Sequence, residues 1–233
     1  MTNDAPLSFL PDALIFDFDG TILDTETPEY HSWQVVYEEY GVELPLAIWT
    51  ESIGRGHDTA TFDPYGYLES LIGRRVDANA IRPRRRARFS ELLALEQPRP
   101  GIVAWLEAAR SLGVPLAVAS SSGRDWVGGG LQQIGLRDYF DVLRCADDVT
   151  RTKPDPELYH AACTALNARP ERSIAIEDSP NGLRAAKQAG MFAVAYPNPM
   201  TAGLSLEIAD LLIENAELMP LSEIFALAAG RQV

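Results

Sequence analysis

The chain has 233 residues, 46% of them hydrophobic and 23% charged, which is typical of a globular protein with a sizeable core. Its formal net charge of −13 argues against a nucleic-acid partner, because such binding depends on lysine and arginine neutralising phosphates. No apolar run approaches the roughly 18 residues of a membrane-spanning helix, and the N-terminus lacks the features of a signal peptide. Because the two cysteines form no metal or redox motif, we expect a cytoplasmic protein without membrane contact.

The first predicted element is a short buried strand that ends in carboxylates. Residues 13–16 read Ala-Leu-Ile-Phe, a continuous apolar run that suits a strand covered on both faces of a parallel sheet. Asp17 and Asp19 would then lie at the carboxyl end of this strand, where open α/β sheets bind ligands. Gly20 permits a backbone conformation that other residues resist, so a tight exit is expected here.

Residues 27 to about 98 contain no convincing strand and are predicted to be helical. The helical segments are residues 30–40, 44–53, 65–73 and 84–96. Trp33, Tyr37 and Tyr40 recur at helical spacing and indicate a core for this block rather than a binding surface. Five arginines between residues 82 and 88 have two interpretations: a solvated helix face, which is the commoner one, or a positive lip that attracts an anionic substrate.

After a proline-rich return at residues 96–101, strands and helices alternate. Strands are expected near residues 114–120, 141–146, 173–178, 191–196 and 210–214, with helices over 101–113, 155–167 and 181–190 and another that ends at Gly135. This alternation predicts parallel β-α-β units and an α/β fold with a doubly wound, Rossmann-like parallel sheet. Residues 1–26 and 99–233 would form the core, and residues 27–98 a small helical domain inserted after the first strand.

The predicted strands are followed by residues that suit phosphate and metal chemistry. Ser120 and Ser121 follow the second strand, Lys153 lies near the third crossover, and Glu177 and Asp178 end the fourth strand. Taken singly, these features read as a loop, a turn or a helix cap. Together at one sheet edge they supply clustered carboxylates, which need a cation among them, and donors for phosphoryl oxygens. Oxygen-only ligands favour a hard ion, and Mg²⁺ is the common one beside a phosphate.

The segments "DFDGTILDTE", "VASSSG", "KPDPELY" and "IEDSPNG" together resemble the four motifs of the haloacid dehalogenase superfamily, across nearly the whole chain. The helical insertion after the first motif is similar to that of the subgroup that includes β-phosphoglucomutases and many small-metabolite phosphatases. The resemblance implies that Asp17 is a nucleophile that forms an aspartyl-phosphate. It also implies that Asp19 is a general acid/base that gives its backbone carbonyl to Mg²⁺.

The same resemblance implies the remaining site residues. Ser120, Ser121 and Lys153 would hold the phosphoryl group, and Asp178 with Glu177 would complete a Mg²⁺ site with the two acids of the first motif. We therefore expect an enzyme, a Mg²⁺-dependent phosphatase of small phosphorylated metabolites with sugar phosphates as the expected class, in a monomer or weak dimer. An intramolecular phosphosugar mutase is the first alternative. A phospho-aspartate signalling or binding protein without turnover is the second, and the helical insertion argues against a receiver domain.

Four residues are expected to influence substrate choice: Glu29, Arg55 and His57 from the helical insertion, and Arg124 from the core. In mutase-like relatives a histidine lies twelve residues after the nucleophile, with a tryptophan four residues later and a Gly-x-Ser-Arg turn in the cap. Here Trp33 keeps that register, but Glu29 stands at the histidine position and the turn reads "IGRGHD". These departures favour net hydrolysis.

Overall fold

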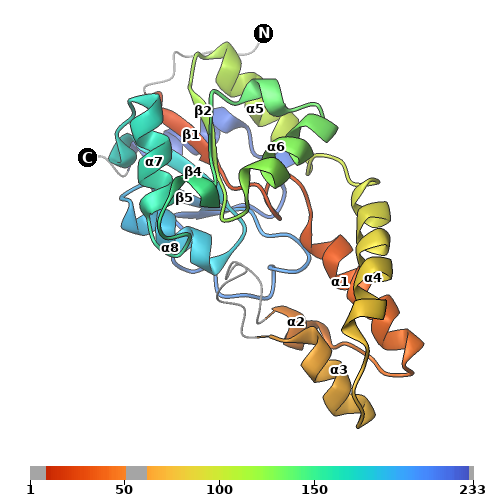
Figure 1. Ribbon diagram of the computed structural model, residues 1–233. Coiled ribbons are helices and arrows are strands. Elements are labelled where there is room, and N and C mark those ends of the chain that lie inside the picture. The colour runs from red at the N-terminus through yellow and green to blue at the C-terminus, as the bar shows by residue number, and fades with distance from the viewer. Residues whose placement is uncertain (1–8, 51–61, 231–233) are drawn as a thin grey trace.

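The computed structural model describes residues 9–50 and 62–230, and its centre is a six-stranded parallel sheet (Figure 1). The strands are β1 (Ala13–Phe16), β2 (Leu116–Ala119), β3 (Val142–Arg144), β4 (Ser173–Glu177), β5 (Phe192–Ala195) and β6 (Leu211–Leu212). Their order in the sheet is β3-β2-β1-β4-β5-β6, so the chain winds outward from β1 in both directions. The predicted doubly wound α/β core is confirmed, and β1 with its acidic end lies between β2 and β4.

Both faces of the sheet are covered by helices, which explains the continuous apolar runs of its strands. Along β1, Leu14 and Phe16 pack into one hydrophobic cluster, while Ala13 and Ile15 pack into another on the opposite face. The first cluster includes α5 (Ile102–Ser111), α6 (Arg124–Gln133) and α9 (Leu221–Ala229); the second includes α7 (Glu157–Leu166) and α8 (Pro180–Gln188).

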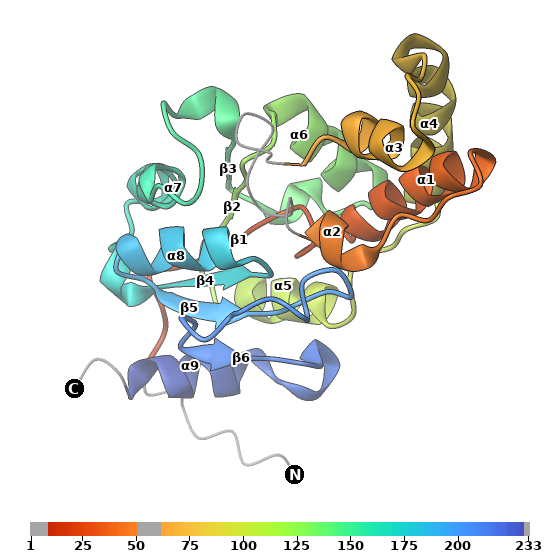
Figure 2. The same cartoon turned by 90° about the horizontal axis from the view of Figure 1, so that it is seen from below.

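The segment between β1 and α5 forms helices α1 (Glu26–Glu39), α2 (Leu46–Thr50), α3 (Pro64–Ile72) and α4 (Ala78–Leu93). These helices project from one side of the sheet in both ribbon views (Figures 1 and 2). They share a third hydrophobic cluster, to which Trp33 and Tyr37 belong with Tyr40 packed against it, as the sequence predicted. Leu23 and Pro98 form a β-bridge, so the two connections to this helical segment lie side by side.

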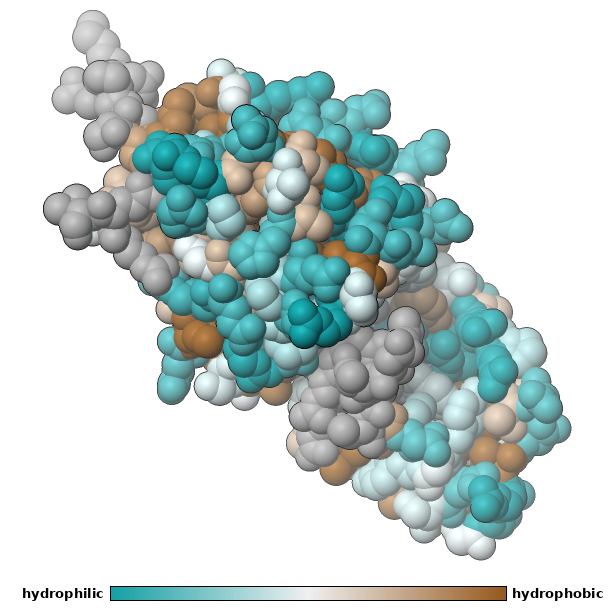
Figure 3. Space-filling model, turned by 60° about the vertical axis from the view of Figure 1, so that its left-hand side comes forward, coloured by the Kyte–Doolittle hydropathy of each residue, from teal (hydrophilic) through white to brown (hydrophobic). Residues whose placement is uncertain are grey.

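Two helices differ most from the sequence expectation. Helix α4 begins at Ala78, six residues earlier than predicted, because the Asp77 side chain caps it, and it contains Pro83 in its interior. Helix α9 was not predicted, although Leu221, Ile224, Phe225 and Ala228 are spaced for one buried face and pack on the core. Within the described ranges, no helix is long and apolar enough to traverse a bilayer. The face drawn in Figure 3 is mainly hydrophilic, with small scattered hydrophobic patches.

Helix α6 packs closely against Phe18, a residue of the acidic turn that follows β1. Phe18, which stands between Asp17 and Asp19 in the sequence, is completely buried. Its ring lies against Gly130 of α6. A Cβ atom on Gly130 would lie 2.5 Å from Phe18 Cζ, whereas a Cβ atom on the neighbouring Gly129 would meet nothing within 4 Å. Glycine at position 130 therefore makes room for the Phe18 ring beside α6.

This contrast gives a matched pair of variants for the fold. Gly129→Ala should stabilise the protein by roughly 1 kcal/mol, because alanine is the better helix former. Its melting temperature should then rise by roughly 2–4 °C. Gly130→Ala should lower the melting temperature by at least that much, because the Phe18 ring must move. Thermal unfolding followed by circular dichroism distinguishes them, and equal shifts for both variants would contradict the close packing.

Candidate active site

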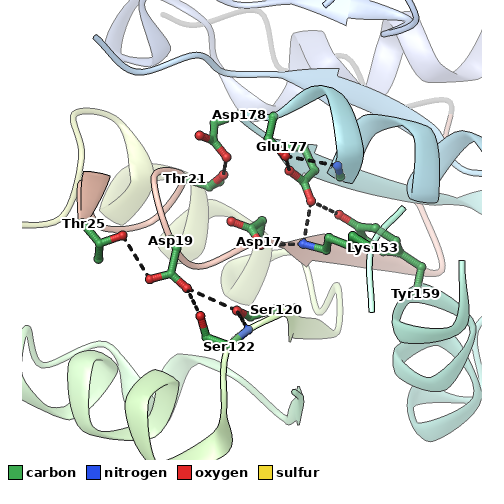
Figure 4. A network of polar contacts seen from close by, with 12 residues as sticks. Asp17, Asp19, Thr21, Thr25, Ser120, Ser122, Lys153, Tyr159, Glu177 and Asp178 are labelled. Carbon is green, nitrogen blue, oxygen red and sulfur yellow. Dashed lines mark hydrogen bonds and ion pairs between the residues drawn. The ribbon is translucent and has the colours of Figure 1, made fainter. Parts of the chain in front are cut away.

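The carboxyl ends of β1, β2 and β4 bring the predicted site residues together (Figure 4). Asp17 follows β1, Ser120 follows β2, and Glu177 and Asp178 end β4. All four are buried, and the loop before α7 brings a buried Lys153 into the same cluster. Helix α7 begins at Glu157, two residues after its predicted start. The five polar residues lie at one sheet edge because their strands are parallel and adjacent.

Lys153 is the cation at the centre of this group. Its Nζ contacts Asp17 Oδ1 and lies 2.6 Å from Glu177 Oε1, which also accepts a 2.6 Å hydrogen bond from Tyr159 Oη. Burial acts to lower the pKa of Lys153, but the ion pairs with Asp17 and Glu177 outweigh it and raise that pKa. The lysine is therefore held fully charged and rigidly placed.

Three carboxylates outnumber this one cation. Ligand oxygens of Asp17, Glu177 and Asp178 all lie within 4.8 Å of one another, and all three residues are buried. Burial raises the pKa of both Asp17 and Asp178, and the neighbouring Glu177 charge raises both further. An oxygen-only, negatively charged and desolvated donor set of this kind fits a hard divalent cation such as Mg²⁺.

Asp178 is oriented by groups from two loops. Thr21 Oγ1 donates to Asp178 Oδ1 at 3.2 Å, and Asn198 Nδ2 donates to Oδ2 at 2.8 Å. Gly20 has a φ of +79°, and a Cβ atom there would lie 2.4 Å from Asp178 Oδ2. The glycine is required twice, by its backbone conformation and by this contact. Arg99 closes the same corner by donating to the Gly20 carbonyl at 2.7 Å.

The Asp19 side chain lies apart from the cluster of three carboxylates. Its carboxylate points toward the loop after β2 and toward Thr25, while Asp17 points toward Lys153 (Figure 4). It accepts hydrogen bonds from Thr25 Oγ1 at 3.0 Å, Trp126 Nε1 at 2.7 Å, Ser122 Oγ at 2.7 Å and Ser120 Oγ at 3.4 Å. Two neighbouring acids in sequence therefore have separate environments, one beside a lysine and one among neutral donors.

Of the four residues expected to influence substrate choice, Glu29 and Arg124 form ion pairs within the protein. Glu29 on α1 accepts from Arg85 Nη1 at 2.6 Å, so the anion at this position is compensated by a cation of α4. The Arg124 side chain is paired with Asp148. Ser121 is half-buried beside Ser120. Arg55 and His57 lie outside the described residues.

The arginine run of α4 is not a uniform surface. Arg82, Arg84, Arg86 and Arg88 are exposed, and two of these four form surface pairs: Arg84 with Glu39 and Arg88 with Glu91. Arg85 is different, because only 12% of its side chain is exposed and its guanidinium lies 5.1 Å from the centre of the Trp33 ring. The exposure of four of the five arginines is compatible with both interpretations of the run, and the fifth, Arg85, faces α1.

Sequence reasoning missed several residues that orient the predicted ones. They are Thr21, Thr25, Ser122, Trp126, Tyr159 and Asn198. Asn198 could have been found, because it follows β5 just as the other site residues follow their strands. Tyr159 could not, because its apolar spacing along α7 matches that of a core residue.

Comparison with known proteins agrees with this geometry. Residues 14–196 match the family model of the haloacid dehalogenase-like hydrolases. YhcW of Bacillus subtilis, which carries a provisional name as a phosphatase, is 47% identical over 210 residues, covering 90% of this chain and 94% of that protein. A phosphorylated carbohydrates phosphatase of Thermotoga maritima is 32% identical over 180 residues, covering 77% of this chain and 82% of that protein.

A solved structure extends the agreement to the fold. A HAD family hydrolase of Deinococcus radiodurans, with bound phosphate and sodium, matches with a TM-score of 0.78 and 27% identity, covering 95% of this chain and 98% of that one. The family model spans most of the chain, and the match to YhcW runs along nearly all of both proteins. The chain therefore belongs to the haloacid dehalogenase-like hydrolases, as its four motifs predicted.

Proposed function

We propose that this hydrolase is a Mg²⁺-dependent phosphatase of small phosphorylated metabolites, with sugar phosphates as the substrate class. The observation that carries the proposal is a buried cluster of three carboxylates at the ends of β1 and β4, one of which, Asp17, is paired with Lys153. The name of the Thermotoga maritima relative, a phosphatase of phosphorylated carbohydrates, supports the substrate class. Phosphoryl transfer requires positioning and charge neutralisation, and this site is built to supply both.

Asp17 is the proposed nucleophile. Its carboxylate oxygen would bond to phosphorus as the bond from phosphorus to the leaving oxygen breaks, which divides hydrolysis into two easier steps. Lys153 would bind the phosphoryl oxygens together with Ser120 and Ser121. Asp17, Asp178, Glu177 and the Asp19 backbone carbonyl would hold Mg²⁺, which when bound supplies neutralisation of phosphate charge.

Asp19 is the proposed general acid and base. It would donate a proton to the leaving alkoxide oxygen, and would then take a proton from the water that attacks the aspartyl-phosphate and releases inorganic phosphate. Its separation from Lys153 suits this role, because an acid and base must gain and lose a proton, and a carboxylate paired with a lysine would be held in its charged form. The neutral donors around it hold the carboxyl group in place through both steps.

Residues 27–98 would serve as the cap, with residues 1–26 and 99–233 as the core. A cap that closes over the site excludes water and presents groups that select the substrate. The Glu29–Arg85 pair offers a carboxylate that can accept hydrogen bonds and a guanidinium that can donate them, which suits the hydroxyl groups of a sugar.

The covalent mechanism predicts the effect of one conservative change. Asp17→Asn should lower turnover of any phosphate ester by about a thousandfold or more, because an amide cannot attack phosphorus. The fold should persist, since the side chain keeps its size. Phosphate release measured with Mg²⁺ over a panel of phosphorylated metabolites tests this, with circular dichroism as the control. A variant that kept a tenth of wild-type turnover would rule out the covalent step.

Three acids with raised pKa values, the half-buried Glu26 and the buried Asp17 and Asp178, predict a pH-dependent stability in the metal-free protein. Burial and the neighbouring Asp19 and Glu29 raise the pKa of Glu26 to about 8, and the pKa values of Asp17 and Asp178 are raised as well. A carboxyl whose folded pKa exceeds its unfolded value stabilises the fold at low pH, and that contribution is lost as the pH rises through the folded pKa. The melting temperature should therefore fall between about pH 5 and about pH 8.

Mg²⁺ should reverse this loss, because binding requires deprotonated ligands. The increase in melting temperature on adding Mg²⁺ should be larger at the higher pH. Glu26→Gln should flatten the pH dependence of the metal-free protein, while Glu223→Gln, which removes an exposed carboxyl of α9, should leave it unchanged. Two outcomes would argue against the buried cation site: a melting temperature of the metal-free protein that rises with pH, or a Mg²⁺-induced increase in melting temperature that is the same at about pH 5 and about pH 8.

Hydrolysis and mutase activity can be separated directly. A mutase must protect its aspartyl-phosphate from water, and Glu29 with its Arg85 partner stands where mutase-like relatives place a histidine. We expect release of inorganic phosphate and no conversion of β-glucose 1-phosphate to glucose 6-phosphate. Phosphorus NMR with a trace of the bisphosphate measures both products, and isomerisation faster than phosphate release would establish the mutase instead.

A further inference from the structure

Trp126 joins the proposed general acid to the helical segment. It lies in the first turn of α6, is 37% exposed, and donates from Nε1 to Asp19 Oδ1 at 2.7 Å. The other residues of this helix that face the core, Val127 and Leu131, are completely buried. An indole left so exposed contributes little to the core of the protein. Its hydrogen bond to Asp19 is the stronger reason for its position.

The opposite side of the indole is held by α4. The Trp126 and Phe89 rings are stacked, with centroids 5.9 Å apart and an angle of 20° between their planes. One turn earlier on the same helix, Arg85 lies 5.9 Å from the Phe89 ring centre and pairs with Glu29 of α1. A continuous set of contacts therefore runs from the Glu29–Arg85 pair through Phe89 and Trp126 to Asp19.

The hydrogen bonds to Asp19 also distinguish its two oxygens. An indole N–H can only donate, so Oδ1 must act as an acceptor toward Trp126. Oδ1 also accepts from Thr25 Oγ1, whereas Oδ2 faces the hydroxyls of Ser120 and Ser122. A hydroxyl can donate or accept, so Oδ2 is the oxygen that is free to carry a proton. Ser120 is a proposed phosphate ligand, so this oxygen is on the side of the phosphoryl site.

We propose that Trp126 is a positioning residue for proton transfer. Its N–H fixes Oδ1 of Asp19 so that Oδ2 delivers the proton to the leaving oxygen, and its stack on Phe89 lets the position of α4 determine how well Asp19 is held. This inference rests on the proposed phosphatase function. It assigns no direct contact with substrate to Trp126.

The test compares two leaving groups. A sugar phosphate releases a basic alkoxide that needs a proton, while p-nitrophenyl phosphate releases a weakly basic phenolate that does not. Trp126→Phe keeps a ring against Phe89 but removes the N–H. It should lower kcat/KM for the sugar phosphate by about tenfold or more, and for p-nitrophenyl phosphate by less than about threefold. The ratio kcat/KM is used because it reports transfer to Asp17 and not the later hydrolysis.

A matched control is available in the core. Trp105 of α5 also donates an indole N–H, to the Met219 carbonyl at 2.8 Å. Unlike Trp126, it is buried in the core. Trp105→Phe should lower the melting temperature without changing the preference between the two substrates. A structural role alone for Trp126 would give the same pattern, with both substrates affected equally.

The role of Phe89 is tested by a double-mutant cycle. Phe89→Leu should reduce sugar phosphate turnover in the same direction as Trp126→Phe, by loosening the indole. In the Trp126→Phe background it should have little further effect on the substrate preference, because the N–H that it positions is already gone. Additive effects would refute the connection through Phe89. An active wild-type enzyme with equal losses for both substrates would refute the Trp126 inference alone, whereas a wild-type enzyme without phosphatase activity would refute the proposed function.

Discussion

The structure depends on a concentration of buried negative charge at the end of β1. Asp17, Glu177 and Asp178 lie together in the interior, and Lys153 forms ion pairs with Asp17 and Glu177. Removing such groups from water is costly, and a single lysine cannot compensate three carboxylates. The site therefore has a deficit of positive charge that a divalent cation would correct. This explains why acids that would destabilise a purely structural core can be kept here.

Much of the surrounding backbone is arranged to permit this crowding. A Cβ atom on Gly182 of α8 would lie 1.9 Å from the carboxyl carbon of Glu177, and one on Gly20 would meet Asp178. Glycine at both positions lets a helix and a turn approach the carboxylates closely. Glu177 is further held by Tyr159 and by Ser179 Oγ at 3.3 Å, so both of its oxygens have protein partners. Glu177 therefore orients Lys153 as well as contributing to the carboxylate cluster.

The fold, and the group of polar residues that meets at one sheet edge, could be predicted from the sequence because both follow from local patterns. Apolar runs indicated the sheet strands, and the residues directly after each strand indicated Asp17, Ser120 and Asp178. Most residues that orient these side chains could not be predicted from the sequence. The hydrogen bond of Trp126 with Asp19, for example, joins positions 107 residues apart. No local spacing encodes such a contact. The partner of Glu29 was missed for the same reason: one arginine in a run of five turns inward, and the run alone does not say which.

Two sets of contacts link the proposed cap to the carboxylate of Asp19. Thr25, the residue before α1, donates to Asp19, and Phe89 near the end of α4 supports the indole that does the same. Asp17 and Lys153, in contrast, are held by residues of the core. Movement of the helical segment would therefore disturb the proton-transfer group while leaving the nucleophile and its cation in place. A substrate that shifts the proposed cap would act on the proton-transfer group rather than on the nucleophile, which would link the choice of substrate to proton transfer and not to the attack on phosphorus.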